Sequence, residues 1–299
     1  METSSGIPSS NTASPKALLL LPDSSLSSCV FGALVRDTRG CELGFDDRYN
    51  HFAASPLCAI SWTFDGDVRV IDIDGDISRP EEAPLPPSLS FAGPQLVPRS
   101  SWNTGDIYAL TLCFYPDAFA RLTGLSVEPY FNRIVPLEEV LEGELLELFL
   151  RVGEIGDAEE GFEFLMERLT RLWGEVRPAR NPLALRVSDW TRSLATQAYF
   201  SGFGRSARQI ERRIRSWTGQ SMRSLNIYAR NDQAFEMAIH AKREGRLHLA
   251  ELSAELGFAD QAHMSRDVRK QTGFSPAELM RRMETEESLW SFRLLGERY

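Results

Sequence analysis

Two segments near the C-terminus carry cationic and hydrogen-bonding side chains at matching spacing. One extends from Ser206 to Gly219 and the other from Asp260 to Gly273. The two glycines are 54 residues apart, and so are Arg212 and Arg266. Each segment is typical of a basic amphipathic helix that ends at glycine. Gln can pair with adenine and Arg with guanine in the major groove of DNA. The repeat therefore favours a protein that contacts two successive stretches of a duplex.

The second segment predicts a complete helix-turn-helix. A helix over Leu249 to Leu256 is expected to turn sharply at Gly257, and Asp260 is placed to cap the next helix. In that next helix Met264 and Val268, four residues apart, are expected in the core, as are Ile210 and Ile214 in the first segment. The outward face of the second helix then presents five residues: Gln261, Ala262, Ser265, Arg266 and Arg269.

The charge of the chain is divided unevenly. The net charge of the 299 residues is −9, but the part from Asn181 onward has 19 Lys and Arg against 14 Asp and Glu, a net charge of +5, which leaves −14 on the preceding part. A basic C-terminal module joined to an acidic N-terminal one fits a DNA-binding domain with an attached second domain, although +5 is also compatible with an ordinary surface.

The run from Gly257 to Arg266, followed by Gly273-Phe274-Ser275-Pro276, resembles the signature of the AraC/XylS transcriptional regulators. The resemblance covers about the last 115 residues and implies a DNA-binding domain at 183–299, with two helix-turn-helix units at about 185–222 and 247–283. A long helix over about 225–243 would join them, and both recognition helices would enter adjacent major-groove segments. Met264 and Val268 stand where the family has larger aromatics, and Met222 where it often has Pro.

Carried over by motif position, the resemblance implies a set of DNA-contacting residues. Arg208, Glu211 and Arg212 would face bases from the first unit, whose turn between Ala195 and Ser206 is longer than usual. In the family an Arg at the position of Arg212 and Arg266 can support the fold as well as contact DNA, and direct contact is favoured. For His263 a capping or packing role is favoured over contact with DNA. The complete predicted set is Arg205, Ser206, Arg208, Glu211, Arg212, Arg215, Gln261, Ala262, His263, Ser265, Arg266, Arg269 and Lys270, the last two placed for phosphates.

The N-terminal half is predicted to be β-rich. Residues 1–15 form a polar lead-in expected to be disordered, strand-like runs cover Ala59–Phe64, Val68–Ile73 and Ile107–Phe114, and the proline-rich stretch from Pro80 to Pro98 should be mostly loop or edge.

Helices are expected after Pro116. The spacing of apolar residues predicts them over Asp117–Leu122, Leu137–Val152 and Glu159–Trp173, with a linker at Arg177–Pro182. The motifs Tyr115 to Phe119 and Ile134 to Glu139 resemble sensor domains of AraC-type regulators, which implies a cupin-like fold at 16–180 whose trailing helices serve as a dimer contact. The fold class predicted is thus α+β, a β-rich cupin-like domain with trailing helices followed by an all-α domain.

An enzymatic N-terminal domain is the less favoured alternative. We find no GxSxG, P-loop or GxGxxG motif, and His51 is its one histidine, too few for a His-rich metal site. Trp62 and Trp102 could line an apolar ligand pocket, although core packing is favoured. Asp72, Asp74 and Asp76 alternate like metal ligands, but Asp-Gly turns explain them more simply.

The partners follow from the resemblance. Promoter DNA is the expected partner, with RNA polymerase, a second copy of the chain and a small-molecule effector as further candidates, and a DNA binder without small-molecule input as an alternative. No cofactor and no metal are expected. The four cysteines form no CxxC pair, and the longest aliphatic run, Ala17 to Leu21, is too short for a membrane span. A soluble, cytoplasmic protein is therefore expected.

Overall fold

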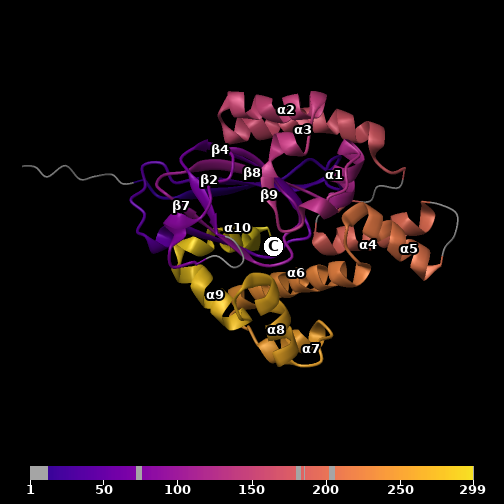
Figure 1. The fold of residues 1–299 in the computed structure, drawn as a ribbon. Helices are drawn as coiled ribbons and strands as arrows, with labels where there is room; N and C mark the ends of the chain where they lie inside the picture. The colour runs from indigo at the N-terminus through magenta and orange to yellow at the C-terminus, as the bar shows by residue number, and fades with distance from the viewer. Residues whose placement is uncertain (1–12, 72–75, 180–182, 185, 202–205, 299) are drawn as a thin grey trace, which may run out of the picture.

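A β-rich N-terminal region is followed by a helical C-terminal region in the computed structural model (Figure 1), as the sequence predicted. The structure describes residues 13–71, 76–179, 183–184, 186–201 and 206–298. Within this part of the chain, no helix is both long enough and apolar enough to cross a bilayer. The predicted lead-in lies mostly outside the described residues, and so do Asp72, Asp74 and the end of the predicted linker at 180–182.

Nine strands form two antiparallel sheets in the described N-terminal region. The six-stranded sheet has the order β1 (Lys16–Leu20), β2 (Val30–Asp37), β8 (Tyr108–Phe114), β4 (Cys58–Asp65), β6 (Leu89–Ala92) and β9 (Ile134–Pro136). The three-stranded sheet has the order β3 (Tyr49–Phe52), β7 (Arg99–Asn103) and β5 (Val68–Ile71).

The central strand β8 alternates between two environments, because successive side chains of a strand point to opposite faces. Leu110, Leu112 and Phe114 are fully buried in the core, whereas Thr111 and Cys113 are half-buried on the other face. That second face is turned toward the C-terminal helices, so small and weakly polar residues lie where the two regions meet.

The predicted strands are confirmed with small shifts. The proline-rich stretch is mostly loop, as predicted, but it also contains β6, which pairs with β4 on one side and β9 on the other and is therefore not an edge strand. The four residues of β6 contain no proline, so every backbone N–H is available for the ladder, and Phe91 is fully buried. The sequence prediction did not include β6 because prolines are frequent on both sides of it.

The α-helices of the N-terminal region come late in its sequence, after β8. α1 (Pro116–Thr123) ends at Gly124 as predicted, and α3 (Ala158–Val176) begins at Asp157, whose carboxylate accepts two backbone N–H bonds. The predicted continuous helix over 137–152 is wrong. The chain forms a short 3₁₀ turn, η4 (Leu137–Glu139), and then starts α2 (Gly143–Ile155) at a glycine with φ 61°. The other 3₁₀ turns of the described residues have the same length and are η1 (Asp46–Arg48), η2 (Pro80–Glu82), η3 (Glu128–Tyr130) and, in the C-terminal region, η5 (Glu287–Leu289).

The C-terminal region is helical throughout its described residues. Its helices are α4 (Val187–Phe200), α5 (Ala207–Thr218), α6 (Met222–Arg243), α7 (Leu249–Glu255), α8 (Gln261–Thr272), α9 (Pro276–Thr285) and α10 (Trp290–Glu297). The predicted helix stops are confirmed, since Gly219 and Gly273 have φ of 70° and 85° at the ends of α5 and α8. α6 is the predicted long connecting helix and begins three residues earlier than expected.

The first helical unit shares one hydrophobic core with the β-rich region. Trp190 of α4 stacks on Tyr115 with ring centroids 5.1 Å apart, and its indole N–H donates to a carboxylate oxygen of the buried Asp117 over 2.7 Å. The Tyr115 hydroxyl donates to the carbonyl of Ala184 over 3.2 Å. Burial raises the pKa of Asp117, with the Trp190 bond acting in the opposite direction. The two regions are thus packed together and not merely tethered.

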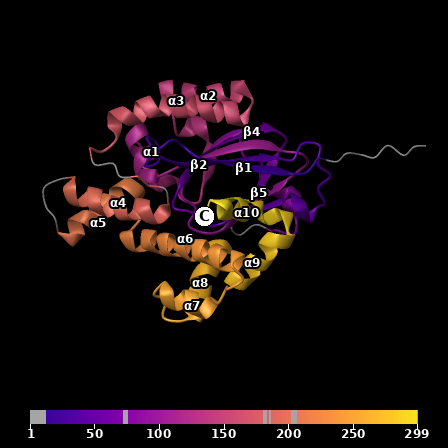
Figure 2. The same cartoon turned by 180° about the vertical axis from the view of Figure 1, so that it is seen from behind.

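The C-terminal helix α10 forms a second attachment (Figure 2). The Trp290 indole N–H donates to Asn50 Oδ1 over 2.7 Å, and the Ser291 hydroxyl donates to the carbonyl of His51 over 2.6 Å. Just before α10, Glu287 accepts a hydrogen bond from the almost fully buried guanidinium of Arg36, over 2.7 Å. The two helical units are therefore each held against the β-rich region at a different point.

Candidate nucleic-acid interface

The helix α5 presents one buried and one exposed stripe. Ser206 caps it through a reciprocal capping box with Gln209, and Ile214 is fully buried while Ile210 packs against the same core. On the other side Arg208, Arg212 and Arg215 are exposed at spacings of four and three residues, which places them on one face of a helix. None of the three has a hydrogen-bonding or ionic partner among the described residues. α5 thus offers a cationic ridge to solvent.

The helix α8 is built in the same way. The Asp260 carboxylate accepts the backbone N–H of His263 over 2.6 Å, which confirms the predicted cap. Met264 is 1% exposed and belongs to a hydrophobic cluster formed with residues of α6, α7, α9 and α10, and Val268 packs against the same cluster. Both predicted core residues are therefore confirmed. The outward residues Gln261, Ala262, Arg266, Arg269 and Lys270 are all exposed, and Ser265 is half-buried between the two faces.

Among the exposed residues of α8, Arg269 is partly engaged. Its guanidinium lies 3.5 Å from the Glu278 carboxylate, an exposed contact of small energy. Gln261, Arg266 and Lys270 have no such partner in the described part of the chain. Donors that are exposed and not satisfied internally are available for phosphates and base edges.

Two predicted contact residues have other partners within the protein. The Glu211 carboxylate accepts the backbone N–H of Met222 over 3.3 Å with each oxygen, at the first turn of α6. The helix dipole favours a negative charge at that position. The His263 ring packs edge-on against Phe258, and its Nε2 lies 3.7 Å from the Asp267 carboxylate. Both side chains are half-buried, so both have structural roles alongside any contact with DNA.

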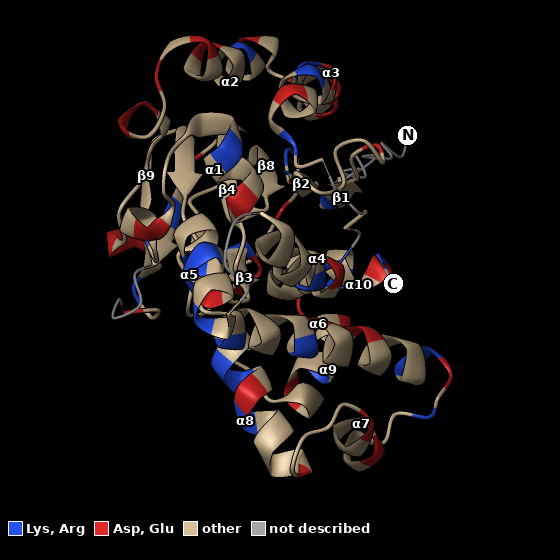
Figure 3. Ribbon diagram, turned by 90° about the vertical axis from the view of Figure 1, so that its right-hand side faces the viewer, with Lys and Arg blue, Asp and Glu red and all other residues tan. Residues whose placement is uncertain are grey.

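The ridges of α5 and α8 lie on one side of the molecule. Figure 3 shows the Lys and Arg positions of the two helices along the same edge, with the start of α6 between them. Arg223, in the first turn of α6, is also exposed and has no partner among the described residues. Arg223 is not among the contacts predicted from the sequence, because the predicted contacts all lie on or beside the two recognition helices. Arg205, the remaining predicted contact, lies outside the described residues.

The candidate ligand-binding residues of the β-rich region turn out to be core residues. Trp62 is 2% exposed, and its indole N–H donates to the carbonyl of Phe149 over 2.9 Å. Trp102 packs against Phe45 and Tyr49. The favoured interpretation, core packing, is confirmed for both. Among the described residues, no group of three or more His, Cys, Asp or Glu is placed to hold a metal ion.

Comparison with known protein families identifies the helical region. Residues 200–282 match the model of a helix-turn-helix domain, and this segment contains α5 through most of α9. This is an AraC-type helix-turn-helix domain. The resemblance seen in the motif from Gly257 to Pro276 is thereby confirmed. The AraC-type domain, with its two exposed basic helices, supports a DNA-binding regulator of transcription. No curated protein sequence matches the chain.

Several solved structures are similar to the chain, at low identity and low TM-score. ToxT from Vibrio cholerae O395 is 12% identical, with 89% of this chain and 95% of that chain covered and a TM-score of 0.34. A second structure of ToxT, from Vibrio cholerae, is 15% identical over 77% of this chain and 93% of that one, with a TM-score of 0.35. The AraC-like transcriptional activator CuxR is 10% identical over 95% and 100%, with a TM-score of 0.24. With scores this low, the assignment rests on the domain match and on the geometry of α5 and α8.

Proposed function

We propose that the protein is a sequence-specific DNA-binding transcriptional regulator in which α5 and α8 are the two recognition helices. The observation that carries the proposal is that α5 and α8 each expose a row of basic side chains on the same edge of the molecule. Each of these helices ends at a glycine in the left-handed conformation. Two helices held by one connecting helix would enter successive major-groove segments on one face of a duplex. The acidic N-terminal region repels phosphate, which leaves this edge as the DNA contact.

The exposed residues divide into two roles. Arg208, Arg212, Gln261 and Arg266 lie on the outward faces and are assigned to base edges, with Ala262 and Ser265 beside them. Arg269 and Lys270, in the last turn of α8, are assigned to phosphates together with Arg215 and Ser206. A base contact contributes discrimination between sequences, whereas a phosphate contact contributes equally to all sequences and releases counterions.

Alanine substitutions separate the two roles. Arg266→Ala should weaken binding to the selected site by about 1–3 kcal/mol and leave binding to random duplex almost unchanged. Lys270→Ala should weaken both and lower the salt slope of the binding constant by about one unit. The measurement is fluorescence anisotropy over a range of salt concentrations, with Arg79→Ala, an exposed residue beside η2 in the β-rich region, as the matched control. Equal losses for Arg266→Ala on both duplexes would remove Arg266 from the base contacts.

Effector sensing and dimerisation complete the proposal. The β-rich region would bind a small molecule, or pair two copies of the chain through α2 and α3, which lie on the side of that region away from α8 (Figure 1). Pairing would raise the apparent DNA affinity through effective concentration. Sedimentation velocity at several protein concentrations tests pairing. Contact with RNA polymerase would then be sought on the complex with promoter DNA.

A further inference from the structure

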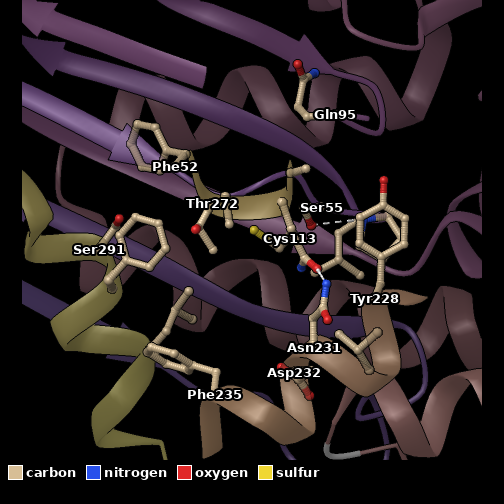
Figure 4. A pocket seen from close by; sticks show the side chains of 18 of the residues that line it. Phe52, Ser55, Gln95, Cys113, Tyr228, Asn231, Asp232, Phe235, Thr272 and Ser291 are labelled. Carbon is tan, nitrogen blue, oxygen red and sulfur yellow. Dashed lines mark hydrogen bonds between the residues drawn. The ribbon is translucent and has the colours of Figure 1, made fainter. Parts of the chain in front are cut away.

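An apolar cavity lies between the β-rich region and the AraC-type domain (Figure 4). Its volume is about 350 Å³, within the roughly 300–1,000 Å³ of small-molecule sites. An engineered apolar cavity of about 150 Å³ already takes up benzene, so this space is sufficient for a larger molecule. Protein interiors contain few voids bigger than one water molecule. The cavity therefore has the size of a ligand site and not of a packing defect.

Both regions contribute walls to this cavity. Phe52 and Cys113 extend from the strands, whereas Tyr228 and Phe235 extend from α6 and Phe292 from α10. Small residues such as Ala59 and Ala234 on the two sides leave the space open. Because Met264, Val268 and Thr272 of α8 also line it, a molecule bound here contacts the second recognition helix directly.

The walls are nearly free of accessible charge. The charged residues among those that line the cavity are Arg99 and Asp232, of opposite sign. The Arg99 guanidinium donates to the carbonyl of Asn132 over 2.6 Å, and both side chains have further partners. Burial raises the pKa of Cys113 to about 12, so its thiol remains neutral at physiological pH. An anionic ligand would lose its hydration without gaining a free cation, which is unfavourable.

The Tyr228 hydroxyl is a polar group on the wall without a hydrogen-bond partner among the described residues, and the buried amide oxygens of Gln95 and Asn231 are two further acceptors there without one. Tyr228 is 9% exposed, and its hydroxyl makes no hydrogen bond with the described residues. Its ring rises from α6 toward the strands, with the hydroxyl at the far end (Figure 4). A buried tyrosine hydroxyl usually finds a hydrogen-bond partner. This hydroxyl can both donate and accept, so it fits a neutral alcohol, phenol or amide.

We propose that the effector site of this regulator is this cavity between the two regions, and that its ligand is a neutral apolar molecule with one hydrogen-bonding group that pairs with the Tyr228 hydroxyl. The inference rests on the proposed function, since it names the site and the chemical class of the effector. Binding there is linked to the docking of α8, because both regions contribute contacts.

Matched probes test the chemical class in the full-length protein. Isothermal titration with 1-octanol should show binding, whereas octanoate, which has the same chain length but a negative charge, should bind at least about tenfold more weakly. Equal or tighter binding of octanoate, or no binding of 1-octanol, would overturn the inference.

Two pairs of variants locate the site. Tyr228→Phe should raise the Kd for 1-octanol about fivefold, the effect of one neutral hydrogen bond, whereas Tyr130→Phe, outside the cavity, should not change it. Ala234→Leu fills the space and should abolish binding, whereas Ala241→Leu on the same helix should not. Unchanged binding in both Tyr228→Phe and Ala234→Leu would place the octanol elsewhere and refute the site. Tyr228→Phe keeps the ring, so it provides the test if Ala234→Leu fails to fold.

DNA binding without any ligand is measured in parallel. A protein that binds a selected duplex but no octanol refutes this inference and leaves the proposed function intact. A protein that binds octanol but no duplex refutes the proposed function.

Discussion

The stability of the folded protein should fall in mild acid because of a single histidine between the two regions. The His51 ring stacks on Tyr49 and meets Phe274 edge-on, with centroids 5.6 Å apart, and its Nδ1 lies 2.8 Å from the Ser100 hydroxyl. Phe274 follows α8, so the burial of this ring depends on the docking of the AraC-type domain. Burial lowers the pKa of His51 from 6.5 to about 4, and the nearby Arg282 adds to the effect while Glu286 opposes it.

The sign and size follow from proton linkage. A base with a lowered pKa in the folded state stays neutral there, whereas the unfolded chain takes up a proton once the pH falls below 6.5. The stability is therefore complete above that pH and is lost as the pH falls from 6.5 toward 4. Between pH 7 and pH 5 the free energy of unfolding should fall by about 2 kcal/mol through this residue alone.

Urea denaturation at pH 7 and pH 5 measures the effect. Carboxylates also titrate, so the informative quantity is the difference between the wild type and His51→Asn, which retains a short polar side chain beside Ser100. His51→Asn should lose about 2 kcal/mol less on acidification than the wild type. His248→Asn, at an exposed histidine before α7, should behave as the wild type. Equal losses for His51→Asn and the wild type would show that His51 is not buried in solution, and hence that the docking described here is absent.

Two further substitutions test the packing of the first helical unit. Trp190→Phe removes the indole donor from the buried Asp117 carboxylate and should cost about 1–3 kcal/mol in urea denaturation; no loss would mean that α4 does not pack there. Gly219→Ala would place a Cβ 2.5 Å from Phe131 Cζ at a φ of 70° and should cost about 2–4 kcal/mol. Gly273→Ala, with φ of 85° but no atom nearer than 3.9 Å, should cost only about 1 kcal/mol, and equal losses for the two would exclude the Phe131 contact.

Much of the DNA-binding region was predictable from sequence because its signals are local. Asp260 caps the helix that follows it, Gly219 and Gly273 adopt the left-handed conformation, and Met264 lies one turn before Val268 on the same face. Each depends on residues within four or five positions along the chain. The exposed residues of α8 followed from the same periodicity.

The features that the sequence did not predict arise from contacts between distant parts of the chain. Strand β6 gains its stability from pairing with β4 and β9, which no local pattern of prolines reveals. Trp190 meets Asp117 across 73 residues, and Trp290 meets Asn50 across 240. The cavity between the two regions has no sequence signature either, because its walls come from strands and helices at both ends of the chain. Tyr228 could not be singled out as a polar group within it.

The most direct test of two recognition helices is hydroxyl-radical footprinting on a duplex selected from random DNA by the full-length protein. The wild type should protect two segments on one face, about one helical turn or 10 base pairs apart. Arg212→Ala should weaken protection mainly of one segment and Arg266→Ala mainly of the other. Failure to protect any discrete segment, or loss of the same segment in both variants, would contradict the account.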